Sequence, residues 1–209
     1  SDLVRYGPKG DQLDDVARAH QTVYAVGDPR TGGWTPWRVL QLPPDEEFNF
    51  ARNACSQWLV RGDGGLLVPL YIGVSSKAPF SVTVAECRFD GARLTHVRHG
   101  NVLRLDVARG LCEPSLIEFR GRHFLTLRND LRGYVSASDD GLHFSPPKKW
   151  LWDAGSELGN YNTQPHWVVP SDGLFLVYPR RGADNAHVFR PRPPLFIGRG
   201  DPEGVYVRR

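Results

Sequence analysis

The chain has 209 residues and a formal net charge of +3, and 40% of its residues are hydrophobic. This length suits one domain, spanning 1–209, with a core of ordinary size. No stretch approaches the roughly 18 apolar residues of a membrane span, so none is expected. The basic residues are scattered rather than clustered, which argues against nucleic acid as a partner.

The composition predicts an all-β fold. The chain contains 22 glycines, 17 prolines and 11% aromatic residues, which suits many short strands joined by tight turns. Residues 11–21 are the nearest candidate for a helix, and the pattern there is weak. Three cysteines are odd in number and lack metal-ligand spacing, so we interpret Cys55, Cys87 and Cys112 as small buried residues and expect neither metal nor cofactor.

In chain order, residues 22–42 are interpreted as the outer half of a first structural repeat, and three clearer copies follow at 57–71, 113–128 and 164–178. Each copy has a polar opening residue, a short strand, a glycine turn and a second strand that ends in Tyr or Arg. The copies begin 56 and 51 residues apart, slightly above the roughly 40–50 residues of a propeller blade. The repeat predicts a β-propeller of four-stranded antiparallel blades, at approximately 1–50, 51–110, 111–160 and 161–209.

Residues 112–150 carry the clearest strand pattern. Strands are expected over 116–120, 123–128 and from 134 onward, because aromatic and β-branched residues recur there between turn residues. The turn after the third strand is Ser138-Asp139-Asp140-Gly141, whose residues bond their own backbone or tolerate a positive φ.

This turn resembles an Asp-box, the hairpin signature of sialidases (neuraminidases) and related β-propellers, which reads Ser-x-Asp-x-Gly-x-Thr-Trp. Asp139 and Gly141 match it, and its Ser, Thr and Trp positions are occupied by Ala137, His143 and Phe144. The resemblance implies that Asp139 binds backbone donors of its own turn and that Phe144 is buried. An Asp-box is structural and also occurs in propellers that are not sialidases.

The same resemblance extends to charged residues. In the sialidase-like pattern, a Glu-Pro-Ser-Leu segment and a strand ending in Leu-Arg carry an active-site glutamate and one arginine of a carboxylate-binding triad. Glu113 and Arg128 match these positions. Arg192 resembles a later arginine of the triad, and Arg190 competes for that role. The first arginine has no convincing motif, and the guesses for it are Arg5 and Arg52.

Other site candidates come from the openings and ends of the repeats, because these positions converge on the axis of a propeller. His166 is a candidate general acid or base, since histidine titrates near neutrality. Tyr178 and Tyr161 are candidate nucleophiles. The remaining candidate substrate-binding residues are Gln57, Asp130, Gln164, Arg180, His187, Arg190 and Arg192.

Several of these residues also have a purely structural interpretation. Glu113 could be a solvated loop residue, and Arg128 could pair with Asp130 on the surface, where the pair would contribute under ~1 kcal/mol. A lone histidine such as His166 is more often structural than catalytic. Arginine accounts for all but four of the 26 basic residues, which reflects either coding bias or the fit of its planar fork to oxyanions.

The resemblance implies a secreted or periplasmic, bacterial sialidase-like exo-glycosidase, monomeric, acting on acidic sugars of glycans. Arginines would hold the sugar carboxylate, a carboxylate-activated tyrosine would attack the anomeric carbon, and an aspartate would handle the proton. Sialidases have six blades and 209 residues make about four, so we expect a partial or shortened propeller.

Two alternatives remain open. A propeller polysaccharide lyase would use a histidine and a tyrosine to abstract a proton beside a uronate carboxylate that an arginine neutralises. His166, His187, a tyrosine and Arg128 would supply those groups. A carbohydrate-binding propeller without catalysis is the second alternative.

Overall fold

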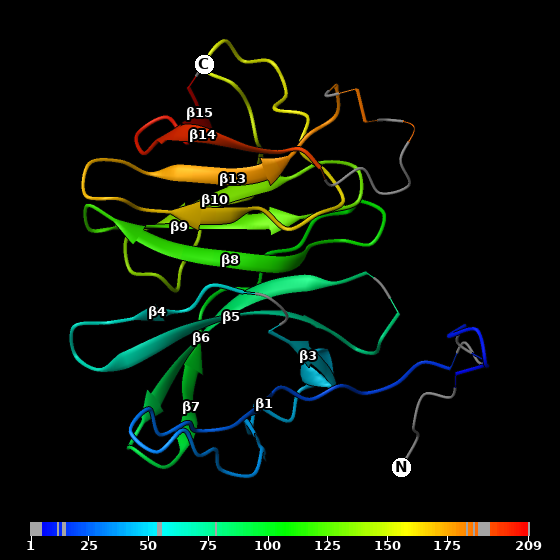
Figure 1. Ribbon diagram of the computed structural model, residues 1–209, viewed down its shortest axis with the longest axis vertical. Coiled ribbons are helices and arrows are strands. Elements are labelled where there is room, and N and C mark those ends of the chain that lie inside the picture. The colour runs from blue at the N-terminus through cyan, green and yellow to red at the C-terminus, as the bar shows by residue number, and fades with distance from the viewer. Residues whose placement is uncertain are drawn as a thin grey trace.

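The computed structural model describes residues 6–11, 13, 16–53, 56–77, 79–182, 184–185, 187 and 193–208. Over this part of the chain the fold is all-β, and antiparallel sheets of two, five, four and four strands follow one another along the sequence, which confirms the predicted fold class (Figure 1). The 3-10 helix η1 (Glu46–Phe48) is a single turn, and the weak helical pattern at 11–21 forms no helix where it is described. No helix of the described ranges is long and apolar enough to cross a membrane.

The first large sheet has the order β3-β5-β6-β7, and β4 pairs with the same edge of β5 as β3 does. Its central strands, β5 and β6, are buried along most of their length, as expected where both faces of a strand are covered, and β5 is rich in Leu, Val and Ile. A two-stranded sheet, β1 with β2, precedes it. The bounds are β1 Val23–Tyr24, β2 Arg38–Val39, β3 Phe50–Arg52, β4 Leu59–Val60, β5 Gly65–Gly73, β6 Ser81–Phe89 and β7 Leu94–His99.

The second and third sheets are simple antiparallel meanders, in the orders β8-β9-β10-β11 and β12-β13-β14-β15. The strands predicted at 116–120, 123–128 and 134 onward correspond to β8, β9 and β10. The bounds are β8 Cys112–Phe119, β9 Arg122–Arg128, β10 Tyr134–Ser138, β11 Lys148–Lys149, β12 His166–Val168, β13 Phe175–Pro179, β14 Leu195–Asp201 and β15 Tyr206–Val207.

The internal repeat is also confirmed. The predicted copies at 57–71, 113–128 and 164–178 coincide with the hairpins β4–β5, β8–β9 and β12–β13. Each is the first hairpin of its sheet, and the sheets lie one above another in Figure 1. The three openings of the repeats therefore occupy equivalent places in successive sheets.

The core consists of layers between neighbouring sheets, and strand β9 shows how the sequence builds them. Its side chains alternate in direction. Leu125 and Leu127 join the cluster shared with the first sheet, whereas Phe124 joins the cluster shared with the third. In that second layer Trp150 packs edge-on against Trp167, with ring centroids 5.5 Å apart.

The Asp-box prediction is correct for the aromatic residue and wrong for the aspartate. Phe144 is buried, as expected. Asp139 projects into solvent, with its side chain 99% exposed. Asp140 instead accepts hydrogen bonds from the backbone amides of Leu142 (2.8 Å) and His143 (2.7 Å), and from the Ser138 hydroxyl (2.9 Å).

The physical reason lies in the end of β10. Ser138 is its last residue and is buried, so its hydroxyl faces the turn and accepts hydrogen bonds from the amides of Asp140 (3.3 Å) and Gly141 (3.0 Å). The pattern that closes the turn is therefore Ser138-x-Asp140-Gly141-x-x-Phe144, shifted by one residue from the aligned aspartate.

Candidate functional site

Glu113 and Arg128 form an ion pair at the end of the β8–β9 hairpin, between Glu113 Oε1 and Arg128 Nη1. Glu113 lies in a β-bulge of β8 and has a φ of 45°. A non-glycine residue with positive φ is sterically unfavourable and is commonly retained where it orients a functional group. Here the bulge turns the Glu113 carboxylate toward the arginine.

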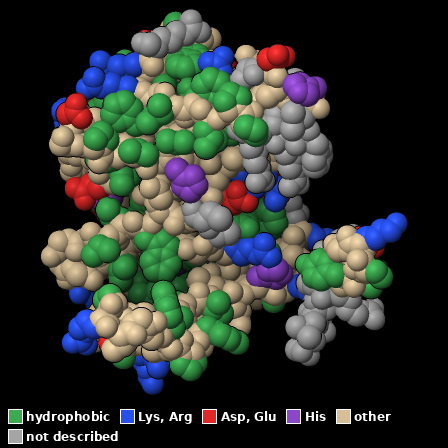
Figure 2. Space-filling view, viewed as in Figure 1, with side chains coloured by type: hydrophobic (Ala, Val, Ile, Leu, Met, Phe, Trp, Pro, Cys, Tyr) green, Lys and Arg blue, Asp and Glu red, His purple; other side chains and the backbone are tan. Residues whose placement is uncertain are grey.

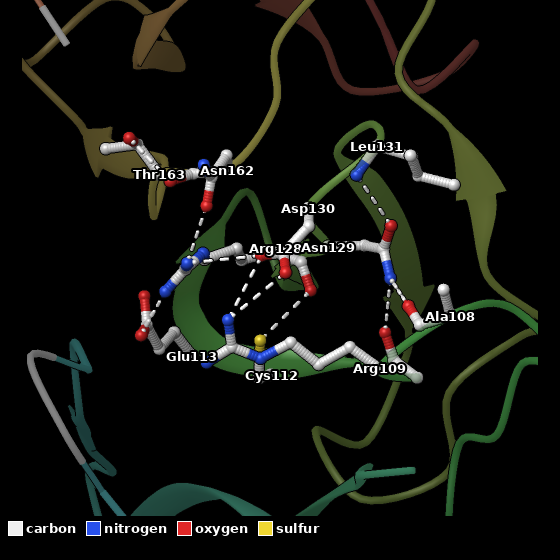
Figure 3. A network of polar contacts seen from close by, with 11 residues as sticks. Ala108, Arg109, Cys112, Glu113, Arg128, Asn129, Asp130, Leu131, Asn162 and Thr163 are labelled. Carbon is white, nitrogen blue, oxygen red and sulfur yellow. Dashed lines mark hydrogen bonds and ion pairs between the residues drawn. The ribbon is translucent and has the colours of Figure 1, made fainter. Parts of the chain in front are cut away.

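Arg128 is the centre of a buried polar network (Figure 3). Its side chain is only 6% exposed. Besides Glu113, its Nη2 donates to Asn162 Oδ1 at 2.9 Å and to Asp130 Oδ1 at 3.3 Å. Asp130 in turn accepts from Arg109 Nη1, at 3.2 Å to each carboxylate oxygen. Asp130 is thus the shared counterion of two arginines, and the pair is not the weak surface contact considered above.

The loops that carry these side chains are fixed by backbone contacts. Asn129 Nδ2 donates to the carbonyls of Ala108 (2.8 Å) and Gly110 (2.6 Å), and the amide of Asn162 donates to the Asn129 carbonyl (3.0 Å). Arg109 and Asn162 also have positive φ, at 67° and 47°. Three left-handed non-glycine residues, counting Glu113, therefore contribute side chains to one network, which is a concentration of local strain typical of functional sites.

A hollow of about 440 Å³ lies beside this network. Two guanidinium groups and one phenol line it, together with small or apolar residues: Phe50, Arg52, Tyr71, Ser76, Phe80 and Arg109. In Figure 2 basic, acidic and histidine side chains gather on one side of the molecule, between the sheet of β8 and the sheet of β5. The network and the hollow together hold three arginines and two carboxylates, so the site carries an excess positive charge.

Tyr71 is the tyrosine of the hollow. It lies two residues before the end of β5, opposite Arg52 of β3. Burial raises the pKa of its phenol, the positive charge of Arg52 opposes that rise, and the negative charge of Glu113 adds to it. Glu113 is therefore close enough to act electrostatically on Tyr71.

His166 is also close enough to Glu113 to be affected by its charge. Burial lowers the pKa of its imidazole, and the charge of Glu113 partly opposes this effect. Its Nδ1 lies 3.5 Å from the Ser115 hydroxyl, which donates to Gln57 Oε1 at 2.9 Å. A half-buried neutral imidazole next to a carboxylate is a reasonable proton acceptor.

The side-chain amides of Gln57 and Gln164 connect the opening segments of the repeats by hydrogen bonds. Gln57 accepts from the amide of Trp167 (2.7 Å) and donates to the Trp167 carbonyl (2.9 Å), which joins the first and third sheets. Gln164 is buried and its Nε2 donates to the Pro114 carbonyl at 3.3 Å. Both amides are thus used in holding the strand openings that carry Glu113 and His166.

The remaining predicted residues lie elsewhere. Tyr178 is buried against Phe196 in the third sheet, only 1% exposed, and Arg180 packs over the same ring with its guanidinium carbon 5.5 Å from the centroid. His187 is exposed, and Tyr161 is covered by Arg181 at 4.2 Å. Arg5, Arg190 and Arg192 lie outside the described residues.

Sequence reasoning overlooked three members of the site: Arg109, Asn162 and Tyr71 as a site tyrosine. Arg109 precedes Gly110 in an irregular segment without strand periodicity, and Asn162 lies in a long loop. Tyr71 lies near the end of the second strand of its repeat, as Arg128 and Tyr178 do in theirs. This equivalence could have identified Tyr71 as a candidate site residue, since the ends of equivalent strands lie on the same side of successive sheets.

Comparison with solved structures supports the fold. The chain matches Trypanosoma rangeli sialidase in complex with sialic acid with a TM-score of 0.51 and 15% identity, over 86% of this chain and 30% of the sialidase. It matches a thermostable family-43 glycoside hydrolase with a TM-score of 0.50 and 13% identity, over 88% of this chain and 69% of that one.

At these identities the likeness is one of fold alone, shared with the β-propeller glycosidases. The chain spans about 30% of the length of the sialidase it matches. Neither a comparison with protein-family models nor one with curated protein sequences finds a match.

Proposed function

We propose that the chain belongs to a glycoside hydrolase of sialidase type, which removes carboxylate-bearing sugars from glycans. The observation that supports this most directly is the lining of one hollow by Arg52, Arg109 and Tyr71, beside the Glu113–Arg128 pair. These are the group types that binding and attacking an acidic sugar require.

The arginines account for substrate recognition. Two guanidinium groups, one from strand β3 and one from the loop before β8, can bracket a carboxylate, and planar forks suit that anion better than ammonium groups do. Arg128 is buried and does not line the hollow, whereas Arg52 and Arg109 do, so these two are the better placed anion ligands. A charge-assisted contact of this kind is worth about 1.5–3 kcal/mol. The predicted convergence of Arg128 and Arg192 on the same carboxylate stays a prediction.

Tyr71 and Glu113 account for the chemistry. A buried phenol with a raised pKa is protonated at neutral pH and needs a base to become a nucleophile. In our proposal Glu113 accepts that proton while the phenolate attacks the anomeric carbon, and the glycosidic C–O bond breaks as the aglycone leaves as an alcohol, its oxygen taking a proton from solvent. Water then attacks the anomeric carbon of the covalent glycosyl-enzyme and loses a proton to solvent, and the released Tyr71 phenolate recovers its proton from Glu113, with overall retention of configuration.

The lyase alternative is favoured by the position of His166, a half-buried imidazole whose Nδ1 lies 3.5 Å from the Ser115 hydroxyl and whose pKa burial lowers. A neutral imidazole beside Glu113 could abstract the proton next to a uronate carboxylate that an arginine neutralises. Both reactions use the same arginines, and they differ in their products.

Product analysis separates the possibilities. The protein is incubated with a sialylated oligosaccharide and, separately, with a uronate polymer. Release of a saturated acidic sugar supports the hydrolase, an unsaturated uronate that absorbs in the ultraviolet supports the lyase, and binding without products supports a carbohydrate-binding propeller.

Substitutions in the hollow test whether it is the site at which the acidic sugar binds. Arg52→Lys and Arg109→Lys retain charge but lose the fork, so each should weaken binding of the acidic sugar about ten- to a hundredfold. Arg132→Lys, which alters an exposed pair with Glu157, is the matched control and should change nothing. If both site variants bind like the control, the hollow is not the carboxylate site.

A further inference from the structure

His20 contacts two residues that line the hollow, Phe50 and Arg52, and its position is fixed by the backbone. Its amide donates to the Asn49 carbonyl (2.8 Å) and its carbonyl accepts from the Ala51 amide (2.9 Å), which forms a parallel bridge beside Phe50. The imidazole packs on the Phe50 ring, with centroids 4.9 Å apart. The preceding segment is also tied down, because the Arg18 amide donates to the Ser76 hydroxyl at 3.0 Å.

The imidazole of His20 contacts Arg52 directly. Arg52 Nε donates to His20 Nδ1 at 3.0 Å, and Arg52 Nη2 lies 2.5 Å from the same nitrogen. A guanidinium has donors only, so Nδ1 must present its lone pair and the ring must be neutral, with its proton on Nε2. Protonation of Nδ1 would replace this acceptor by a donor and place two cations in contact.

We propose that His20 is a positioning residue for carboxylate binding: it holds Arg52 toward the hollow while its ring is neutral and releases it when the ring is protonated. This inference rests on the proposed function, in which Arg52 is an anion ligand. It predicts that acidic sugars bind more weakly as the pH falls below neutrality.

The charges around the ring agree with this direction. Burial, and then the positive charges of Arg52 and Arg18, lower the pKa of His20. The ring is therefore neutral at pH 7, and protonation occurs below the ordinary value of 6.5. When His20 is protonated, Arg52 loses the His20 Nδ1 acceptor. Of the two polar residues that line the hollow with Arg52, the cationic Arg109 repels the guanidinium, whereas the Tyr71 hydroxyl remains a hydrogen-bond partner for it.

Three forms of the full chain test the inference. His20→Asn places an amide oxygen close to the position of Nδ1 and cannot titrate. His20→Phe keeps the ring packing on Phe50 and removes the acceptor. Binding of free sialic acid is measured by calorimetry at pH 7.5 and pH 5.0 for the wild type and both variants, and circular dichroism verifies that each is folded.

We expect the wild type and His20→Asn to bind within about twofold of each other at pH 7.5, and His20→Phe to bind about tenfold more weakly. At pH 5.0 the wild type should lose about tenfold in affinity while His20→Asn retains its affinity. If His20→Asn loses as much affinity at pH 5.0 as the wild type does, or if His20→Phe binds as tightly as the wild type at pH 7.5, the role of His20 is overturned. The proposed function is not affected by either result. If the wild type binds no acidic sugar at either pH, the proposed function fails and the inference fails with it.

Discussion

Glu113 and Arg128 form their ion pair although they are not opposite each other in the sheet. The residue opposite Arg128 is Cys112, and the next regular pair is Ser115 with Thr126, so β8 contains one residue more than β9 over this interval. Without that bulge, alternation would direct Glu113 to the face opposite to that of Cys112. The irregularity in β8 therefore creates the pair on which the site is centred.

The first prediction concerns the energetic role of this pair. Arg128→Met should lower the free energy of unfolding by about 2–4 kcal/mol, because it leaves the largely buried Glu113 carboxylate without its ion-pair partner, whereas the more exposed Asp130 keeps Arg109. Urea unfolding followed by tryptophan fluorescence measures the change. Arg132→Met breaks an exposed pair with Glu157 and should cost under about 1 kcal/mol. Equal effects of the two variants would mean that Arg128 is not buried as described.

The second prediction uses the two adjacent aspartates of the β10 turn. Asp140→Ala removes the acceptor of two backbone amides and should cost about 1–2 kcal/mol, as loss of a cap does at a helix start. Asp139→Ala should be neutral within about 0.5 kcal/mol, since that side chain is exposed. If denaturant unfolding instead shows a larger loss of stability for Asp139→Ala than for Asp140→Ala, Asp139 closes the turn, as the alignment to the Asp-box predicted.

The sequence was sufficient for the parts of the fold that depend on periodicity and turns. The hairpins β4–β5, β8–β9 and β12–β13 each show apolar residues around a turn, so both strand positions and their equivalence could be predicted. Glu113 and Arg128 were found because they lie at the ends of such strands.

The remaining site residues could not be predicted because their positions depend on contacts distant in sequence. Arg109 reaches the site through a loop held by Asn129, and Asn162 reaches it from a segment 34 residues beyond Arg128. The one-residue error at Asp139 has a local cause: both aspartates suit a turn, and only the burial of Ser138 decides which one faces inward.

The third prediction concerns the loop that carries Arg109. A Cβ at Gly110, whose φ is 67°, would lie 2.1 Å from the Phe80 carbonyl oxygen. Gly110→Ala must therefore displace backbone and should cost more than about 3 kcal/mol, in addition to weakening sugar binding. Gly121→Ala has a similar φ of 76° but open space around it, so it should cost only about 1 kcal/mol. A comparable effect at both positions in thermal unfolding would contradict the close approach at Gly110.

The fourth prediction concerns the pH dependence of stability. Burial lowers the pKa of His20, His96 and His166 below the ordinary value of 6.5. The unfolded chain therefore binds protons at these sites before the folded chain does, so stability should be constant above about pH 7 and fall as the pH decreases toward 5. The slope cannot exceed about 1.4 kcal/mol per pH unit for each histidine.

Urea unfolding between pH 8 and 5 measures this slope. Because each ring is partly exposed, we expect the observed slope to lie well below that ceiling. His166→Gln should reduce it, and His187→Gln, at an exposed position, should not. A slope of opposite sign would show that the folded state protonates these rings more readily than the unfolded chain.

The last prediction distinguishes two tyrosines near the ends of equivalent strands, Tyr71 of β5 and Tyr178 of β13. Tyr71 lines the hollow beside Glu113, whereas Tyr178 is packed against Phe196 in the core. If the chain hydrolyses sialosides, Tyr71→Phe should reduce turnover about 10³-fold or more, because it removes the nucleophilic oxygen while retaining the ring. Its free energy of unfolding should change by under about 1 kcal/mol. Tyr178→Phe is the matched control and should leave turnover unchanged.

Mass spectrometry provides the second readout of this experiment. A fluorinated acidic sugar that slows hydrolysis of the glycosyl-enzyme should add covalently to the wild type and to Tyr178→Phe, with the label on the peptide that contains Tyr71. No label should appear on Tyr71→Phe. Turnover that survives in Tyr71→Phe, or a label on another peptide, would assign the nucleophile elsewhere. The Glu113 carboxylate would then be assigned to activating a water molecule as general base.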